Sequence, residues 1–175
     1  MKKYIYLLTF CYFLMSCASE EKLTEAFCPE IFISKEHKEY YSSADQNYDD
    51  VNFSTSINNF NSKCKSNNEG SILSILDILF VVKPLKQDVR EYSFYYFVSI
   101  LDDNDNVLDY QIFEKNGRFM IGDGQIPQET EVVDSLDQFL PTSENNFYKI
   151  GIGFVLNENL YNYIKSMFKF FTDPK

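Results

Sequence analysis

The chain has 175 residues, enough for one ordinary domain, and its 26 acidic residues outnumber its 16 lysines and arginines. The resulting net charge of −10 opposes binding to the phosphate backbone of nucleic acids, which attracts basic surfaces. The composition therefore predicts a single domain and excludes nucleic acid as an expected partner.

The N-terminus has the pattern of a secretory signal peptide. Lys2 and Lys3 precede Tyr4–Met15, an uncharged and mostly apolar run of 12 residues. As a helix this run would reach roughly 18 Å, which is short of the roughly 30 Å hydrocarbon core of a bilayer. A buried N-terminal helix or strand is the weaker alternative, because it leaves the charges on both sides of the run unexplained. We therefore predict a signal peptide over residues 1–16.

The end of this run resembles the lipobox of bacterial lipoproteins. Leu14-Met15-Ser16-Cys17 supplies an aliphatic residue, a tolerant position, a small residue and a cysteine. In that class the thiol takes up diacylglycerol, so the resemblance implies that Cys17 is acylated, with simple secretion as the alternative. Each buried CH₂ contributes roughly 0.8 kcal/mol, so two or three acyl chains anchor a protein stably to membrane lipid.

The residues after Cys17 refine this address. Ala18 and Ser19 resemble the signal for sorting to the outer membrane, and the acidic Glu20-Glu21 with the Asn-, Ile- and Lys-rich composition is most similar to lipoproteins of Bacteroidota. The resemblance implies a lipid-anchored protein of the cell outer membrane that faces the periplasm or the cell surface. It covers about the first 22 residues and implies no activity. Residues 17–27 are expected to form a tether.

The cysteines separate by position. Cys11 leaves with the signal peptide and Cys17 carries lipid, so Cys28 and Cys64 remain. In an oxidising envelope this pair predicts a disulfide, with two free buried thiols as the alternative. A loop of about 36 residues would stabilise the fold by roughly 3–4 kcal/mol in the chain-entropy model. Two thiolates without a nearby further ligand do not predict a zinc site.

Strand patterns dominate residues 28–156. We expect a loop over 35–50 and a hairpin turn at Asn116-Gly117. Residues 72–82 predict a central strand, with a helix as the alternative, and Asp77 in that strand should face the rim or find a partner. Gly151 and Gly153 suggest close backbone approach in the last strand, and residues 131–140 fit either a strand or a helical turn. The pattern predicts an all-β sandwich of immunoglobulin or fibronectin-III type with about seven strands. The expected strands are 29–34, 51–64, 72–82, 92–101, 107–114, 118–121 and 147–156.

Residues 157–175 predict a closing amphipathic helix with its N-cap at Asn157. Such a face most often covers one end of a sandwich, and docking on a partner or on the membrane is the alternative. The expected apolar face holds Leu160, Ile164, Phe168 and Phe171, and Lys165 and Lys169 lie opposite.

Residues with catalytic or metal-binding chemistry are few. His37 is the only histidine, and its charged surroundings predict a solvated loop residue. Asp102, Asn104 and Asn106 match the first three positions of a calcium loop. Val107 and Phe113 then stand where that loop needs glycine and glutamate, so a turn between strands explains this segment better. We predict no catalytic residue, no cofactor and no metal site beyond this weak calcium candidate.

The sequence thus predicts the cellular location of the protein more sharply than its molecular activity. The favoured function is a non-enzymatic binding or assembly module of the cell envelope, with an envelope protein as its partner. One alternative is a small envelope hydrolase that uses a carboxylate pair. Another is a periplasmic carrier of a small ligand.

Overall fold

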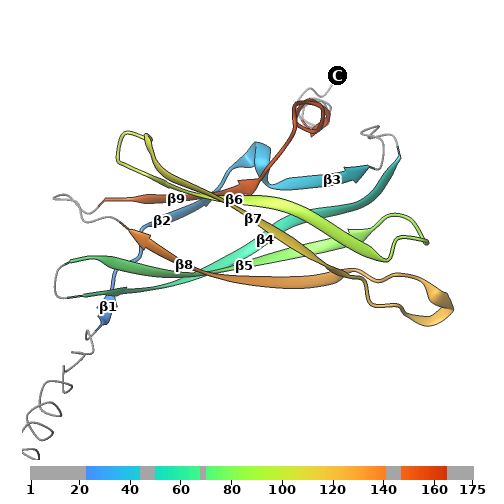
Figure 1. Cartoon of the computed structure of the whole chain (residues 1–175), viewed down its shortest axis with the longest axis horizontal. Coiled ribbons are helices and arrows are strands. Elements are labelled where there is room, and N and C mark those ends of the chain that lie inside the picture. The colour runs from blue at the N-terminus through green and yellow to red at the C-terminus, as the bar shows by residue number, and fades with distance from the viewer. Residues whose placement is uncertain (1–22, 44–49, 68–69, 141–146, 165–175) are drawn as a thin grey trace, which may run out of the picture.

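Two β-sheets pack face to face in the computed structural model, which describes residues 23–43, 50–67, 70–140 and 147–164 (Figure 1). One sheet has the order β1-β4-β5-β8, with β3 also paired to β4, and the other has the order β2-β9-β6-β7. The predicted all-β sandwich is confirmed, whereas its likeness to immunoglobulin or fibronectin-III domains stays a prediction. The strands are β1 Thr24–Ala26, β2 Glu30–Ile33, β3 Glu39–Ser43, β4 Val51–Ser66, β5 Ile72–Pro84, β6 Glu91–Leu101, β7 Val107–Arg118, β8 Thr130–Leu140 and β9 Lys149–Phe154.

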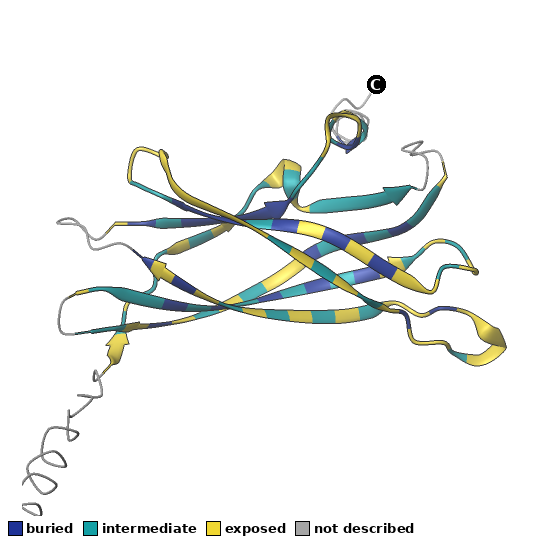
Figure 2. Cartoon of the chain, viewed as in Figure 1, coloured by how far each residue is buried: buried dark blue, intermediate teal, exposed yellow. Residues whose placement is uncertain are grey.

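The core lies between the sheets and is rich in aromatic rings. Alternate residues of β5 and β6 are buried, as the period of a strand requires (Figure 2). Phe80 of β5 meets Phe94 and Tyr96 of β6, with ring centroids 5.1 and 4.9 Å apart. These contacts join the two sheets at the centre of the molecule.

The strand β9 runs beside two neighbours and needs its glycines. It pairs parallel with β2 and antiparallel with β6. A Cβ atom at Gly151 would lie 2.7 Å from Ser99 Oγ, and one at Gly153 would lie 2.6 Å from His37 Cβ. The predicted close approach at both glycines is confirmed.

The predicted hairpin at Asn116-Gly117 is wrong. The strand β7 continues through both residues, which pair with Ser93 and Tyr92. A Cβ atom at Gly117 would lie 2.3 Å from Tyr92 Oη, so glycine is needed there because the Tyr92 ring lies against the backbone. Among the described glycines, only Gly70 and Gly124 have a positive φ. The predicted strand over 118–121 is also wrong, because β7 ends at Arg118 and residues 119–121 contribute only an isolated bridge, between Ile121 and Pro127.

Two short strands lie where no strand was predicted. The strand β1 falls within the expected tether and pairs with the end of β4, with Ala26 opposite Cys64. The strand β3 falls within the expected 35–50 loop, where Tyr40 packs on Phe53 at a ring-centroid distance of 6.2 Å. In both cases pairing with the long β4 compensates for a weak local strand pattern.

Two open questions of the sequence are settled along β5 and β8. Residues 131–140, which also fitted a helical turn, lie in β8 and pair along the length of β5. The predicted partner of Asp77 is Ser135, whose hydroxyl donates to Asp77 Oδ1 over 2.5 Å.

A helix over residues 158–164 follows the last strand. The side chain of Asn157 accepts a hydrogen bond from the Leu160 N–H over 2.8 Å, which confirms the predicted N-cap. Leu160 and Ile164 are buried, so the described part of the helix packs on the domain. Phe168, Phe171 and the two lysines lie outside the described residues. No described helix is long and apolar enough to cross a membrane.

Candidate functional site

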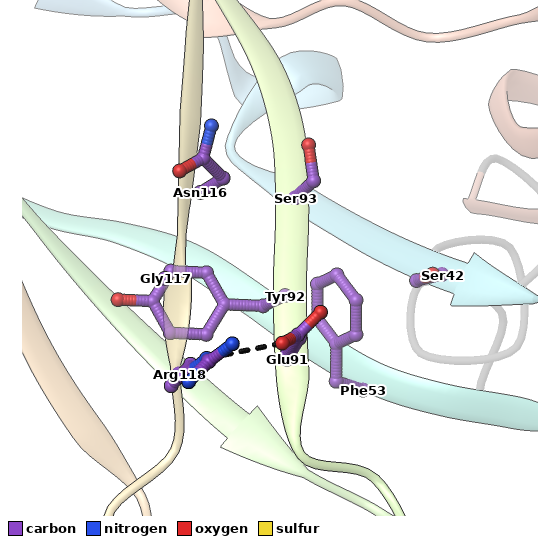
Figure 3. Close-up of a pocket in the computed structure, with 8 residues that line it drawn as sticks. All are labelled: Ser42, Phe53, Glu91, Tyr92, Ser93, Asn116, Gly117 and Arg118. Carbon is purple, nitrogen blue, oxygen red and sulfur yellow. Dashed lines mark hydrogen bonds and ion pairs between the residues drawn. The ribbon is translucent and has the colours of Figure 1, made fainter.

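A hollow lies where β6 begins and β7 ends (Figure 3). Its volume is about 590 Å³, within the range of small-molecule sites. Tyr92 and Phe53 supply aromatic surface, and burial raises the pKa of Tyr92. The residues that line it come from β3, β4, β6 and β7; they are Ser42, Phe53, Glu91, Tyr92, Ser93, Asn116, Gly117 and Arg118.

The rim of this hollow is polar and paired. The Arg118 Nε donates to Glu91 Oε1 over 3.0 Å, and both side chains are largely exposed. Ser93 donates to Glu114 over 3.0 Å. The rim could therefore offer hydrogen bonds to a polar ligand above an aromatic wall. The lining residues include no histidine or cysteine.

The first half of β7 forms a second candidate surface. Val107 to Ile112 are six consecutive exposed residues, on both faces of the strand (Figure 2). β7 is an edge strand that pairs only with β6 among the described strands. Four of the six side chains are large and apolar, namely Val107, Leu108, Tyr110 and Ile112. We call this segment, residues 107–112, the exposed edge.

One ring of the exposed edge is held in place. Tyr110 stacks on Phe97 of the neighbouring β6, with centroids 5.2 Å apart and an interplanar angle of 28°. Partial burial raises the pKa of Tyr110, so the hydroxyl stays protonated at neutral pH. The exposed edge thus presents an ordered aromatic ring, and the backbone N–H of Tyr110 donates to Asp109 Oδ1 over 2.9 Å.

A polar cluster closes the opening between the sheets beside β7 and β8. The Tyr96 hydroxyl donates to Asp134 Oδ2 over 2.6 Å, and Lys115 Nζ donates to Asp134 Oδ1 over 2.9 Å. Burial, with a further contribution from the bond to Asp134, raises the pKa of Tyr96. Because the cluster joins β6, β7 and β8, it holds the edges of the two sheets together.

The predicted calcium candidates lie together in a turn, where the Asp102 carboxylate accepts hydrogen bonds from the other two residues. Asp102 Oδ1 accepts the backbone N–H groups of Asn104 and Asn106, over 2.9 and 2.8 Å. Asp102 Oδ2 accepts from the Asn106 side-chain amide over 2.9 Å. These bonds, led by the one from the Asn106 side chain, lower the pKa of Asp102. The geometry is that of a turn between β6 and β7.

The cysteine prediction can be followed for one pair. Cys28 and Cys64 form the predicted disulfide, with their Cα atoms 5.2 Å apart. The bond lies beside β1 and secures the segment that leads into the domain. Cys17, the predicted lipid site, lies outside the described residues.

The prediction that His37 is a solvated loop residue is wrong. It belongs to the short 3₁₀ helix η1 (Lys35–His37) and is half-buried. Its Nδ1 donates to the Phe154 carbonyl over 2.8 Å, and its ring packs against Phe97 and Tyr161 at centroid distances of 5.5 and 6.2 Å. The sequence around it is charged, but Gly153 leaves room for the histidine above β9, so its role is packing.

Two features of these candidate surfaces were not predicted from the sequence. The exposed edge was predicted as a strand, but its edge position depends on strand order, which the sequence does not specify. The expected hairpin placed Arg118 in a separate strand, so the ion pair between Glu91 and Arg118 was not predicted. Apolar and polar residues do not alternate continuously through residues 107–118, so no local signal favoured one unbroken strand over a hairpin.

The fold is that of a two-sheet, all-β domain with one disulfide and a short helix after its last described strand. The chain matches no protein-family model, no curated protein and no solved structure.

Proposed function

We propose that this protein is an outer-membrane lipoprotein, anchored through acylated Cys17, whose sandwich is a non-enzymatic binding or assembly module of the envelope. The observation that supports a binding role is the exposed edge of β7. Its expected partner is an envelope protein that contributes an extended, apolar strand.

Pairing with such a strand suits the chemistry of the exposed edge. An edge strand presents unpaired N–H and C=O groups that another chain can pair with. Natural edges are usually shortened or charged to prevent this. The exposed edge is long and carries a single charge, at Asp109.

Site-specific photocrosslinking in cells tests the partner. A photoreactive phenylalanine analogue at Tyr110 should form a discrete crosslinked product with an envelope protein. The matched control is Val133 of β8, which is similarly exposed on another edge strand. Equal products from both positions, or none from Tyr110, would contradict binding at the exposed edge.

Palmitate labelling tests the proposed lipid anchor at Cys17. Replacing Cys17 by alanine should abolish labelling of the protein by alkyne palmitate, because no thiol then remains at the lipobox. Replacing Cys11 by alanine is the control and should leave the label intact. Label that persists in Cys17→Ala would overturn the lipid anchor.

The hollow beside Arg118 supports a second candidate, a carrier of a small polar ligand. Its volume and its aromatic wall fit a small molecule. Native mass spectrometry of the purified protein should then show a co-purifying ligand. That ligand should be lost in Arg118→Ala and retained in Arg90→Ala, which changes an arginine that does not line the hollow. A mass equal to that of the bare protein would argue against this candidate.

A further inference from the structure

One end of the sandwich carries a group of exposed apolar side chains. Three phenylalanines there are exposed to an unusual degree: Phe27 by 98%, Phe139 by 74% and Phe147 by 71%. Leu23, the first described residue, is also exposed. We call these four residues the proximal patch, because they lie at the end of the domain that leads to Cys17.

Backbone pairing places the proximal patch at one end of the molecule. Leu23 and Phe139 each lie next to one row of paired residues that crosses β1, β4, β5 and β8. Phe27 and Phe147 line a common hollow of about 290 Å³ at the same end, together with Ile72 of that row. Figure 1 shows β1, the end of β8 and the start of β9 at this end. The row consists of Thr24, Ser66, Ile72 and Leu140.

The length of chain before the domain limits how far this end can lie from the membrane. Six residue steps separate Cys17 from Leu23. At 3.3–3.6 Å per residue, they span at most roughly 20 Å. The opposite end of the sheets, near Met120, is farther away by about the length of a long strand, roughly 40 Å for a strand of 13 residues.

We propose that the proximal patch inserts into the lipid interface and holds the sandwich end-on to the outer membrane. The inference rests on the lipid anchor of the proposed function and adds a second contact with lipid. Apolar rings favour the boundary between headgroups and acyl chains, because contact there removes them from water. A short tether makes this contact effectively intramolecular, so modest apolar surface suffices.

The charge around the proximal patch selects the lipid. Glu30 and Asp103 line the same hollow as Phe27, with Lys149 as the cation beside them. The acidic turn over 102–106 also lies at this end, because Leu101 pairs with Lys149 at the start of β9. Anionic headgroups would repel these carboxylates. The contact is therefore expected with zwitterionic lipid such as phosphatidylethanolamine.

The absence of tryptophan from the chain provides a direct test. Single reporters are introduced as Phe27→Trp and Phe147→Trp, and as Met120→Trp at the opposite end, where the side chain is also exposed. The lipidated protein is reconstituted into vesicles of phosphatidylethanolamine and phosphatidylcholine, with or without bromine on the acyl chains. Flotation of the vesicles reports the anchor, and tryptophan emission reports the contact of each site with lipid.

The expected result is blue-shifted emission and strong bromolipid quenching for the reporters at residues 27 and 147, and neither for the reporter at 120. Replacing part of the lipid by phosphatidylglycerol should reduce the quenching. Protein that does not float with the vesicles refutes the anchor and this proposal together. Floating protein without quenching at residue 27 refutes this proposal alone. Equal quenching at all three sites refutes the end-on orientation, because the domain would then lie on its side.

Discussion

Replacing Gly117 by alanine should destabilise the protein because the new methyl group meets Tyr92. The added Cβ would lie 2.3 Å from Tyr92 Oη and 2.6 Å from Tyr92 Cζ, well inside normal contact. Tyr92 is 7% exposed, and its ring centroid lies 5.2 Å from that of Phe119, so a shift of the ring would disturb its packing on Phe119. Overpacking of this kind typically costs about 1–3 kcal/mol.

A double-mutant cycle with Tyr92→Leu separates this cause from a backbone effect. Leucine removes the ring atoms that the new methyl group would meet. The cost of Gly117→Ala should therefore shrink in the Tyr92→Leu background, with a coupling of about 1–2 kcal/mol. Urea unfolding followed by circular dichroism gives the four free energies. Unchanged m-values would show that the variants unfold in the same way.

Gly122→Ala provides the matched control. A Cβ atom there would lie 2.1 Å from the Gln128 side-chain amide, an even shorter contact. Gln128 is exposed and can swing aside, so this substitution should change the free energy of unfolding by less than about 0.5 kcal/mol. A neutral Gly117→Ala, or an equal cost with tyrosine and leucine at position 92, would refute the close-approach reasoning.

Three further outcomes follow from contacts described above. Replacing Cys28 and Cys64 by alanine should lower the free energy of unfolding by about 4 kcal/mol for the separation of 36 residues, and a loss below about 1 kcal/mol in urea unfolding would contradict the entropic account. Asp134→Ala should cost about 1–3 kcal/mol, because the buried Tyr96 hydroxyl loses its acceptor, and Tyr96→Phe in the same chain should recover part of that loss. The lowered pKa of Asp102 means that its carboxylate stabilises the fold at neutral pH and loses this effect as the pH falls below about 4. The stability gap between the wild type and Asp102→Ala should therefore close in acid, and a gap that is independent of pH would contradict this cause.

The parts of the fold that follow from local pattern were predicted well. The alternation in Val51, Phe53 and Thr55 predicts β4, and the apolar run from Ile72 predicts β5. Counting the cysteines predicts the Cys28–Cys64 bond because two cysteines are left once the expected signal peptide and the expected lipid site are set aside. These inferences need only the period of a strand or the redox chemistry of the envelope.

The parts that depend on distant neighbours were predicted poorly. Asn116-Gly117 is a strong hairpin signal, but the need for glycine there comes from Tyr92, 25 positions earlier in the chain. The polar β3 is a strand because β4 lies beside it, and His37 is half-buried because Gly153 leaves room for it. The candidate surfaces have the same origin: strand order decides that β7 is an edge, and no local pattern encodes that order.

The parallel pairing of β2 with β9 has a consequence for how the protein forms. Residues 30–33 pair with residues 149–152, so the ladder joins the first part of the domain to nearly its last. Such non-local contacts require closure of a long loop before they stabilise anything, which slows folding. Until β9 is available, β2 lacks its pairing partner and its edge stays open. A chain that stopped before residue 149 would leave that edge permanently unpaired and prone to aggregation. The sandwich can therefore be completed only after β9, the last described strand, has been synthesised.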